Sequence, residues 1–372
     1  MTSESGFERL RRHVQRTSAT LFVAAILFGA PPWSCYAQSE APSLTPTEVD
    51  QVVDHLAAAL DNYVFPDIAA KLKAEIQSHQ GEYRGISSPT VLAARLTADM
   101  RAVGHDQHLA VMFDEQLAIK KDSTPEEEQH AHAFDLASGF GVRSVRRLPG
   151  NIGYVDLSYF SPDRDAGAVF AAVMQLVNGT DALILDLRRN GGGSGETETT
   201  LLSYFFKDTT QLSSVVETVE GRIHERQHWT SAYVQGPRYT GKPLFILTSR
   251  HTHSAAEVLA YDLQNSHLAV ILGEPTSGDA TSATGTIDLG HHFSAFIANG
   301  QVKSPITNRN YIGTGVLPDV PTAQAAALLT AYGLALKGAT SSVTSDELTK
   351  ERASAMKDPQ DALLQEVNGF PQ

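Results

Sequence analysis

The chain has 372 residues, of which 42 % are hydrophobic and 19 % are charged. This is the composition of a globular protein and excludes an intrinsically disordered chain. Lys and Arg number 29 against 42 Asp and Glu, so the formal net charge is −13. Such acidity, with no basic patch to offset it, argues against nucleic acid as a partner. The length allows two domains.

Residues 1–37 have the pattern of a signal peptide. Four arginines precede an apolar run over 20–30, and small residues lead to a cleavage point after Ala37. The run is too short to span a bilayer comfortably, although an N-terminal membrane anchor is the alternative. We therefore expect an exported protein, periplasmic or extracellular, with a linker over 38–46. Cleavage would remove Cys35, the only cysteine, which excludes thiol catalysis. No later segment is apolar for long enough to give a stable membrane span.

Three amphipathic helices are predicted within residues 47–120, which indicates a small helical N-terminal domain. Capping or proline signals mark their starts at Thr45–Glu48, Pro66 and Ser88–Thr90. Residues 121–132 are rich in charge and predict an exposed connection. In such a segment His130 and His132 fit solvated side chains better than metal ligands.

From about residue 139 strands and helical patterns alternate. Strands are predicted over 152–157, 182–187, 244–247 and 268–272, with helical patterns over 165–177, over 196–206 and after Ser254. Strands that feed helices in this way predict an α/β domain, which we assign to residues 133–338. The remaining polar tail, 339–372, is expected to be helical in part.

Ser254 lies between the apolar strand 244–247 and an amphipathic helix. A serine at a strand-to-helix elbow can point its hydroxyl into a cleft, beside N–H groups that can hold an oxyanion. Ser254 and Glu257 also form the Ser-x-x-Glu pattern of a helix start, so an N-cap role is the alternative.

Two further segments offer groups for chemistry. Residues 186–195 (Asp-Leu-Arg-Arg-Asn-Gly-Gly-Gly-Ser-Gly) follow a buried strand, and their glycines can turn N–H groups toward an anion. They lack the Gly-Lys-Ser/Thr of a phosphate loop, and a plain glycine turn is the alternative. Residues 104–109 (Gly-His-Asp-Gln-His-Leu) end the third helix. A histidine here is a candidate base or a surface residue at the helix C-terminus.

Four motifs in a fixed order resemble those of the tail-specific, or C-terminal processing, serine peptidases of family S41. The branch that contains interphotoreceptor retinoid-binding protein and the tricorn core protease is the most similar, since 106–109 and 150–154 also resemble it. The resemblance covers about residues 45–335. It implies an α/β domain of the ββα-spiral type, related in shape to crotonases, behind a helical N-terminal domain. The four motifs occupy residues 186–193, 254–257, 273–278 and 313–320.

The resemblance implies an exported serine peptidase that hydrolyses peptide bonds of a peptide or protein substrate through an acyl-enzyme. Ser254 matches the nucleophile, and His108 matches the base of the tricorn-like branch. The oxyanion donors are matched by the N–H of Ala255 and by one glycine among Gly191, Gly192 and Gly193. No metal and no cofactor is expected.

Two positions depart from the family pattern. Asp279 stands where the Ser/Lys branch has its lysine, so a Ser/Lys dyad is not available. Ile312 stands where the tricorn-like branch has its triad acid, and isoleucine cannot orient or charge-stabilise a histidine. Catalysis would then need a Ser/His dyad or a substitute acid such as Asp106. The alternative function is a non-catalytic protein that binds a peptide or an apolar ligand on the same fold.

Overall fold

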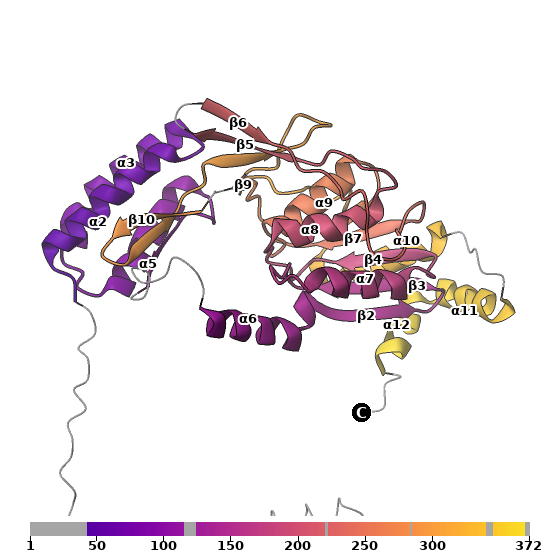
Figure 1. The fold of residues 1–372 in the computed structure, drawn as a ribbon. Coiled ribbons are helices and arrows are strands. Elements are labelled where there is room, and N and C mark those ends of the chain that lie inside the picture. The colour runs from indigo at the N-terminus through magenta and orange to yellow at the C-terminus, as the bar shows by residue number, and fades with distance from the viewer. Residues whose placement is uncertain (1–42, 115–123, 220–221, 283–284, 340–344, 369–372) are drawn as a thin grey trace, which may run out of the picture. The chain divides into compact units, whose positions relative to one another are not determined.

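A computed structural model describes residues 43–114, 124–219, 222–282, 285–339 and 345–368 (Figure 1). The predicted signal peptide and most of the predicted linker lie outside the described residues. Within the described ranges, no helix combines the length and apolar character needed to cross a membrane.

The helical N-terminal region is confirmed, and its helices begin at the predicted signals. Thr45 and Glu48 form a capping box, in which the Glu48 carboxylate accepts the Thr45 N–H at 2.8 Å. The apolar stripes of the helices meet in one core, where Leu56, Leu72 and Leu96 are fully buried. The elements are α2 (Pro46–Ala59), η1 (Leu60–Asn62), α3 (Pro66–Ser78), α4 (Gln80–Tyr83) and α5 (Pro89–Gly104).

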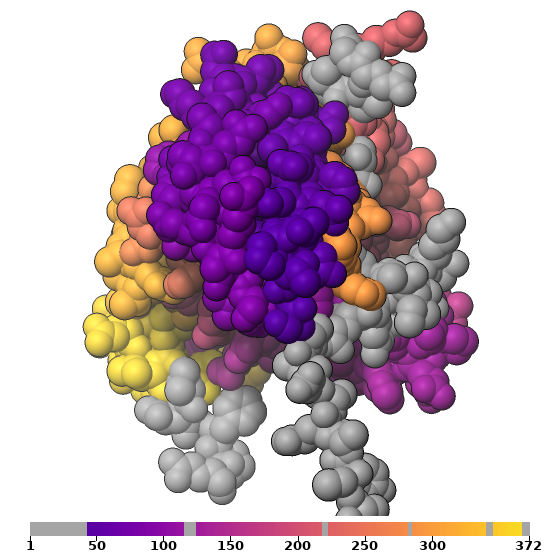
Figure 2. All heavy atoms as spheres, turned by 90° about the vertical axis from the view of Figure 1, so that its left-hand side faces the viewer, coloured from indigo at the N-terminus to yellow at the C-terminus, as the bar shows by residue number. Residues whose placement is uncertain are grey.

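A hairpin from far along the chain completes this helical core. β10 (Thr286–Gly290) and β11 (Phe293–Phe296) pair antiparallel, and β11 pairs with β1 (Ala110–Phe113) just after α5. Leu289 and Phe293 of the hairpin are fully buried among the helices. Figure 2 shows orange segments of this part of the chain directly beside the indigo helices. The hairpin belongs to the range that the sequence assigns to the α/β domain, because local patterns do not reveal long-range pairing.

The predicted α/β architecture is also confirmed. A six-stranded sheet has the order β13-β8-β7-β4-β3-β2, and all neighbours are parallel except β2, which is antiparallel to β3. Its strands are β2 (Val142–Leu148), β3 (Ile152–Leu157), β4 (Ala182–Asp186), β7 (Leu244–Thr248), β8 (Val270–Gly273) and β13 (Val320–Pro321). Helices α7 (Ala166–Val177), α8 (Gly195–Leu202, continued by η3, Ser203–Phe205) and α9 (Ala255–Asn265) cover one face, and α10 (Gln324–Gly338) covers the other (Figure 1).

The central strands bury both faces, which is why they read as continuous apolar runs. In β4, Leu183 and Leu185 pack under α7–α9, whereas Ala182 and Ile184 pack under α10. The carboxyl ends of adjacent parallel strands lie at one edge of a sheet, where ligands usually bind. The loop after β4 carries the three glycines and the loop after β7 carries Ser254, so the sheet brings both to the same edge.

One prediction was wrong and one part of the fold was not predicted. Most of residues 125–132 are exposed as expected, but they belong to helix α6 (Pro125–Ala137) and not to a loop. Thr124 and Glu127 form a capping box with proline at N1, the same signal as at Thr45, which the high charge of this segment obscured. A four-stranded sheet was missed altogether. Its order is β6 (Arg222–Arg226), β5 (Ser214–Val219), β12 (Gly300–Lys303), β9 (Thr281–Ser282). The remaining elements are η2 (Gly139–Gly141) and, in the tail, α11 (Asp346–Lys357) and α12 (Pro359–Asn368).

Two acidic side chains of the α/β domain lie in its core. Asp262 of α9 accepts hydrogen bonds from the Ser213 N–H at 3.1 Å and the Ser213 hydroxyl at 2.5 Å. Burial nevertheless raises the pKa of Asp262 to about 6. Burial, with Asp262 nearby, also raises the pKa of Glu198 well above its usual value. These two carboxyl groups therefore take up protons more readily in the folded chain than in the unfolded one.

We expect the free energy of unfolding to increase as the pH falls from 7 to about 4. Folded Asp262 has a pKa of about 6 against an ordinary value of 3.8, so its stabilising protonation is lost as the pH rises through 6. The difference corresponds to about 3 kcal/mol. Urea unfolding of wild type and Asp262→Asn at the two ends of this range measures the effect. Asp262→Asn should flatten the dependence, and a variant that keeps the full wild-type slope would contradict the assignment.

Candidate active site

Ser254 adopts a strained backbone conformation at the turn from β7 to α9. Its φ is 54° and its ψ is −123°. A capping serine normally has an extended backbone, whereas a positive φ in a residue with a side chain stores strain. A strained strand-to-helix turn is typical of a nucleophile elbow. The backbone therefore favours the elbow interpretation over a plain N-cap, although Ser254 does begin the helix.

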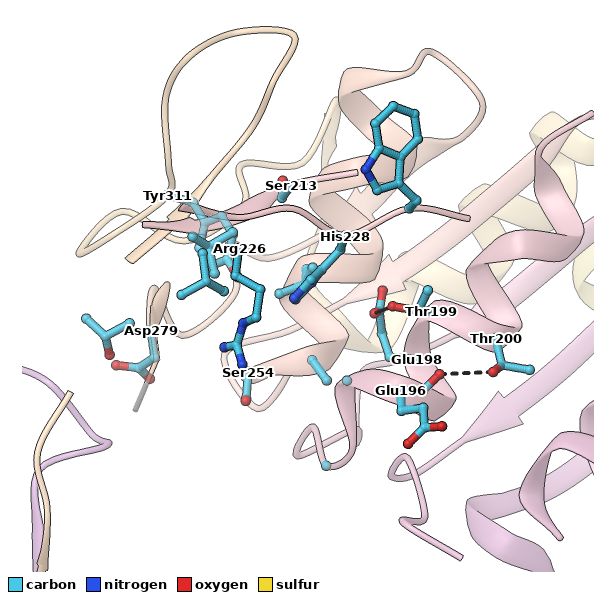
Figure 3. Close-up of a pocket in the computed structure, with 18 of the residues that line it drawn as sticks. Glu196, Glu198, Thr199, Thr200, Ser213, Arg226, His228, Ser254, Asp279 and Tyr311 are labelled. Carbon is cyan, nitrogen blue, oxygen red and sulfur yellow. Dashed lines mark hydrogen bonds between the residues drawn. The ribbon is translucent and has the colours of Figure 1, made fainter. Parts of the chain in front are cut away.

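Ser254 lies in the wall of a pocket of about 690 Å³. Gly193 and Ala255 line the pocket beside it, and the unpredicted strands β5, β6 and β12 supply part of the opposite wall. Figure 3 shows the Arg226 side chain extending from β6 toward Ser254. Deeper groups include Glu198 and Tyr311, whose Oε1 and hydroxyl are buried without a hydrogen-bond partner among the described residues.

The N–H groups of the glycine loop have different partners. Gly191 N–H donates to the Ser158 carbonyl at 3.2 Å, and Gly192 N–H donates to the Asn190 side chain at 2.8 Å. Within the described part of the chain, the N–H groups of Gly193 and Ala255 make no hydrogen bond. Both residues line the pocket next to Ser254. Of the three glycines that the sequence offered, Gly193 is therefore the one whose N–H, together with the N–H of Ala255, is available to donate to a ligand atom in the pocket.

Gly192 supports Ser254 from behind. Its φ is +91°, and a Cβ added there would lie 2.7 Å from the Ser254 Cβ and 2.8 Å from the His253 carbonyl oxygen. Asn190 also joins the glycine loop to the serine turn, because its backbone carbonyl accepts the His253 N–H at 3.0 Å. The glycine loop and the serine turn thus pack against each other with no space for a side chain between them.

A chain of hydrogen bonds fixes His108. Its Nδ1 lies 2.8 Å from the Thr281 hydroxyl, which lies 3.1 and 3.2 Å from the two Asp106 oxygens. The carboxylate can only accept, so Thr281 donates its one proton to Asp106 and accepts from Nδ1–H of His108. Nε2 is then the unprotonated nitrogen. Asp106 also accepts the His108 N–H at 2.9 Å and the Tyr63 hydroxyl at 3.0 Å.

Asp106 remains a carboxylate in this buried network. Burial would raise the pKa of Asp106, but the hydrogen bonds and charge of His108, with the Tyr63 hydroxyl, lower it below the ordinary value. Its Oδ1 is 3.4 Å from His108 Nδ1, which places a negative charge close to the imidazole. This is the electrostatic role that a triad acid has.

Ile312 cannot be a hydrogen-bond partner of His108, because its side chain is apolar. Its side chain is half-buried and packs against the core of the α/β domain, and its N–H donates to the Asn310 side chain at 3.3 Å. The carboxylate that the structure brings to the histidine is that of Asp106. Another histidine near the serine, His251, is exposed on the loop before Ser254.

His108 lies beside the residue that precedes Ser254. The described residues His108 and Ser254 share no hydrogen bond, and the closest aromatic contact of His108 is His253, at 4.9 Å between ring centroids. His253 directly precedes Ser254 in the chain. Catalytic hydrogen bonds are often long in structures without substrate and tighten when substrate binds.

His253 has its own acidic partner. Its Nε2 lies 3.0 Å from Oδ2 of Asp279, and this neighbour raises the pKa of His253. Burial works against ionisation of Asp279, but His253 and the Gln107 N–H lower the pKa of Asp279 below its ordinary value. The sequence singled out Asp279 only as the residue that replaces a lysine. Asp279 and Thr281 were both missed as site residues, because neither has a motif of its own.

The Glu257 carboxylate ties the parts of the site together. Glu257 is fully buried at the third position of α9. The donors come from the serine turn and from the loop 276–279, which leads to Thr281. The carboxylate accepts five hydrogen bonds of 2.5–3.2 Å, from the N–H groups of Ser254, Gly278 and Asp279 and from the hydroxyls of Thr276 and Ser277.

We expect Glu257→Gln to destabilise the fold by about 3 kcal/mol or more, because an amide N–H₂ then faces donors that need an acceptor. The exposed pocket residue Glu196 gives the matched control, and Glu196→Gln should unfold at the wild-type urea concentration. Thermal and urea unfolding of the two variants make the comparison. Equal stability of Glu257→Gln and wild type would show that the five hydrogen bonds contribute no net stability.

Models of peptidase family S41 match both the α/β domain and the helical region of the chain. The model of "Peptidase family S41" matches residues 151–322, and the model of the "N-terminal domain of Peptidase_S41 in eukaryotic IRBP" matches residues 44–136. The two matches adjoin in the order of the helical region and the α/β sheet. The family predicted from the four motifs is therefore confirmed.

Named relatives match only parts of this chain. A carboxyl-terminal-processing protease of Synechocystis is 33 % identical over 131 residues, covering 35 % of this chain and 29 % of the relative. A chloroplastic carboxyl-terminal-processing peptidase 2 of Arabidopsis thaliana is 27 % identical over 180 residues, covering 47 % and 33 %. The chain thus spans about a third of the length of these relatives.

Solved structures share the fold. A putative peptidase from Parabacteroides merdae superposes with a TM-score of 0.56 and 17 % identity, covering 81 % of this chain and all of the other. A photosystem II D1 C-terminal processing protease gives a TM-score of 0.50 and 16 % identity over 75 % of this chain and 94 % of the other. At such identities the likeness concerns the fold alone.

Proposed function

We propose that this chain is an exported serine-type peptidase that cleaves peptide or protein substrates through an acyl-enzyme on Ser254. The observation that carries the proposal is the strained Ser254 backbone beside two N–H groups that have no partner in the described chain. The match to a peptidase family supports it, as do the relatives named as processing proteases. Export rests on the predicted signal sequence.

The proposed reaction uses one histidine twice. Ser254 Oγ attacks the scissile carbonyl carbon while its proton moves to Nε2 of His108. The oxyanion that forms accepts hydrogen bonds from the N–H groups of Gly193 and Ala255. His108 then gives the proton to the departing amine, which leaves the acyl group as an ester on Ser254. Water attacks the ester with His108 again taking the proton, which returns to Ser254 as the acid product leaves.

Asp106 acts through Thr281 in this scheme. The Nδ1–H of His108 donates to Thr281, whose own proton goes to Asp106, so the carboxylate orients the ring without holding it directly. The negative charge of Asp106 also stabilises the imidazolium that forms when Ser254 attacks. This arrangement gives the acid function to a residue outside the position where Ile312 stands.

Ser254→Ala and Ser254→Gly should both abolish covalent labelling of the purified protein by a fluorophosphonate probe, because both lack the hydroxyl. Their stabilities should differ, since glycine relieves the positive φ and alanine does not. We expect Ser254→Gly to be more stable than Ser254→Ala by about 1 kcal/mol. Mass spectrometry and urea unfolding measure the two effects. Ser231→Ala, in the same pocket, is the control that should still label, and labelling of Ser254→Ala would refute the nucleophile assignment.

Thr281→Val and Asp106→Asn should each slow labelling by at least about tenfold, because either change breaks the route from the acid to His108. The double variant should be little slower than either single variant, as expected for residues that act in one chain. Labelling rates, with circular dichroism to check folding, provide the measurement.

The variant Ile312→Glu tests whether position 312 can supply the acid. Because Asp106 already lies beside His108, Ile312→Glu should not accelerate labelling. An unpaired carboxylate beside the core should lower the free energy of unfolding by roughly a few kcal/mol. If Ile312→Glu labels faster than wild type while Thr281→Val labels at the wild-type rate, residue 312 and not Asp106 is the position of the acid.

One observation favours the second candidate, a non-catalytic protein that binds a peptide or an apolar ligand. Ser254 and His108 make no hydrogen bond in the structure, which is the arrangement that a binding protein would tolerate. The same probe decides between the candidates. A wild-type protein that binds peptide by calorimetry and never labels would be a binding protein.

A further inference from the structure

Three potential metal ligands converge beside the serine turn. His108, His253 and Asp279 each direct one ligand atom to a common region, and the three atoms lie within 4.8 Å of one another. The side chains come from three separate parts of the chain: the connection from α5 to β1, the loop after β7, and the loop before β9. Asp279 also lines the pocket, so solutes can approach the group.

The contact between His253 and Asp279 has the geometry of two ligands. His253 Nε2 and Asp279 Oδ2 are 3.0 Å apart, yet Oδ2 is buried without an aligned hydrogen bond to any described residue. Atoms that bind one ion point toward the ion and not toward each other. Ligands about 2 Å from a tetrahedral zinc ion are roughly 3.3 Å apart, so this pair is already at ligand spacing.

The third ligand comes from His108. Thr281 holds Nδ1, which leaves Nε2 as the nitrogen with a free lone pair. Two imidazoles and one carboxylate are a common protein ligand set for zinc, with the fourth position left to water or substrate. The Thr281 and Asp106 contacts are the outer-shell support that metal-ligating histidines usually have. The exposed fractions of the His108 and His253 side chains are 12 % and 27 %, which allows an ion to enter.

We infer that His108, His253 and Asp279 bind one Zn²⁺ ion and that the bound ion blocks His108 as a base. The ion would occupy Nε2, the nitrogen that takes the Ser254 proton in the reaction proposed above. Zinc binding and acylation would then exclude each other. The blocking step rests on the proposed function, whereas the binding site does not. This inference departs from the expectation that the protein binds no metal.

The binding test uses purified full-length protein, freed of metal by a chelator and titrated with Zn²⁺ in a calorimeter. We expect one ion per chain. His253→Gln and Asp279→Asn should each weaken binding by at least about tenfold, because loss of an outer-shell partner alone already costs about that much. Titration with Co²⁺ and visible absorption gives an independent readout of the ligand geometry. Asp279 is buried, so Asp279→Asn can unfold the protein; His253 is only half-buried, and His253→Gln, with its folding checked by circular dichroism, decides the outcome.

The chain offers two matched controls. His251→Gln changes an exposed histidine on the same loop and should leave the affinity unchanged. His132→Ala removes a ligand of the other cluster, formed by His132, Asp163 and Asp165 on the surface, and should also leave the affinity unchanged. Equal affinity of wild type and His253→Gln, or loss of binding in His132→Ala, would overturn the site.

The blocking step has a separate readout. Zn²⁺ should slow fluorophosphonate labelling of Ser254 in wild type, half-maximally at the free concentration that half-saturates the calorimetric site. Labelling should recover on adding a chelator, and in His253→Gln it should need at least about tenfold more Zn²⁺. Unchanged labelling of the zinc-bound protein would overturn the block. If wild type never labels without metal, the proposed function fails while the calorimetric result still decides the site.

Discussion

The arrangement of the site depends on one buried carboxylate, that of Glu257. It accepts five hydrogen bonds and has no Lys or Arg partner among the described residues, so its charge is held by neutral donors alone. Charge-assisted hydrogen bonds are stronger than neutral ones, and an unmade one in the interior is costly. The serine turn and the loop 276–279 therefore share one anchor. The Ser-Ala-Ala-Glu motif needs its glutamate for this contact, in addition to the helix start that it also forms.

This anchor explains how distant segments reach one site. Beyond residue 279 the chain continues into β9, where Thr281 contacts His108, and then into the β10–β11 hairpin, which completes the core of the N-terminal helices. A shift of the anchored loop would move Thr281 away from His108 and change the packing of Phe293. Packed interfaces have few alternative arrangements, so the position of the histidine relative to the serine is fixed by core packing as well as by polar contacts.

Local signals in the sequence predicted the elements that such signals control. Thr45, Pro66 and Ser88 mark helix starts through capping and proline geometry, and the apolar run in β4 reflects burial on both faces. The sheet β6-β5-β12-β9 and the pairing of β1 with β11 depend on contacts between distant residues, for which short patterns contain no information. The same limit applies to the site. Ser254 lies on a motif, whereas Thr281 and the pair of His253 with Asp279 become visible only when the chain is folded.

The electrostatics of the site favour positive charge at the imidazoles. Asp106, Glu257 and Asp279 are all buried, and within the described ranges none of them pairs with Lys or Arg. Such a group of carboxylates stabilises a cation placed between them more than water would, because the interior screens charge weakly. In the proposed reaction, the imidazolium formed during acylation would benefit from this field, and so would the proposed divalent ion. In the proposed reaction the field requires a carboxylate near His108 and not a carboxylate from one particular strand or loop, so Asp106 could serve in place of an acid at position 312. The proposed competition between a proton and a metal for the same nitrogen would follow from the same cause.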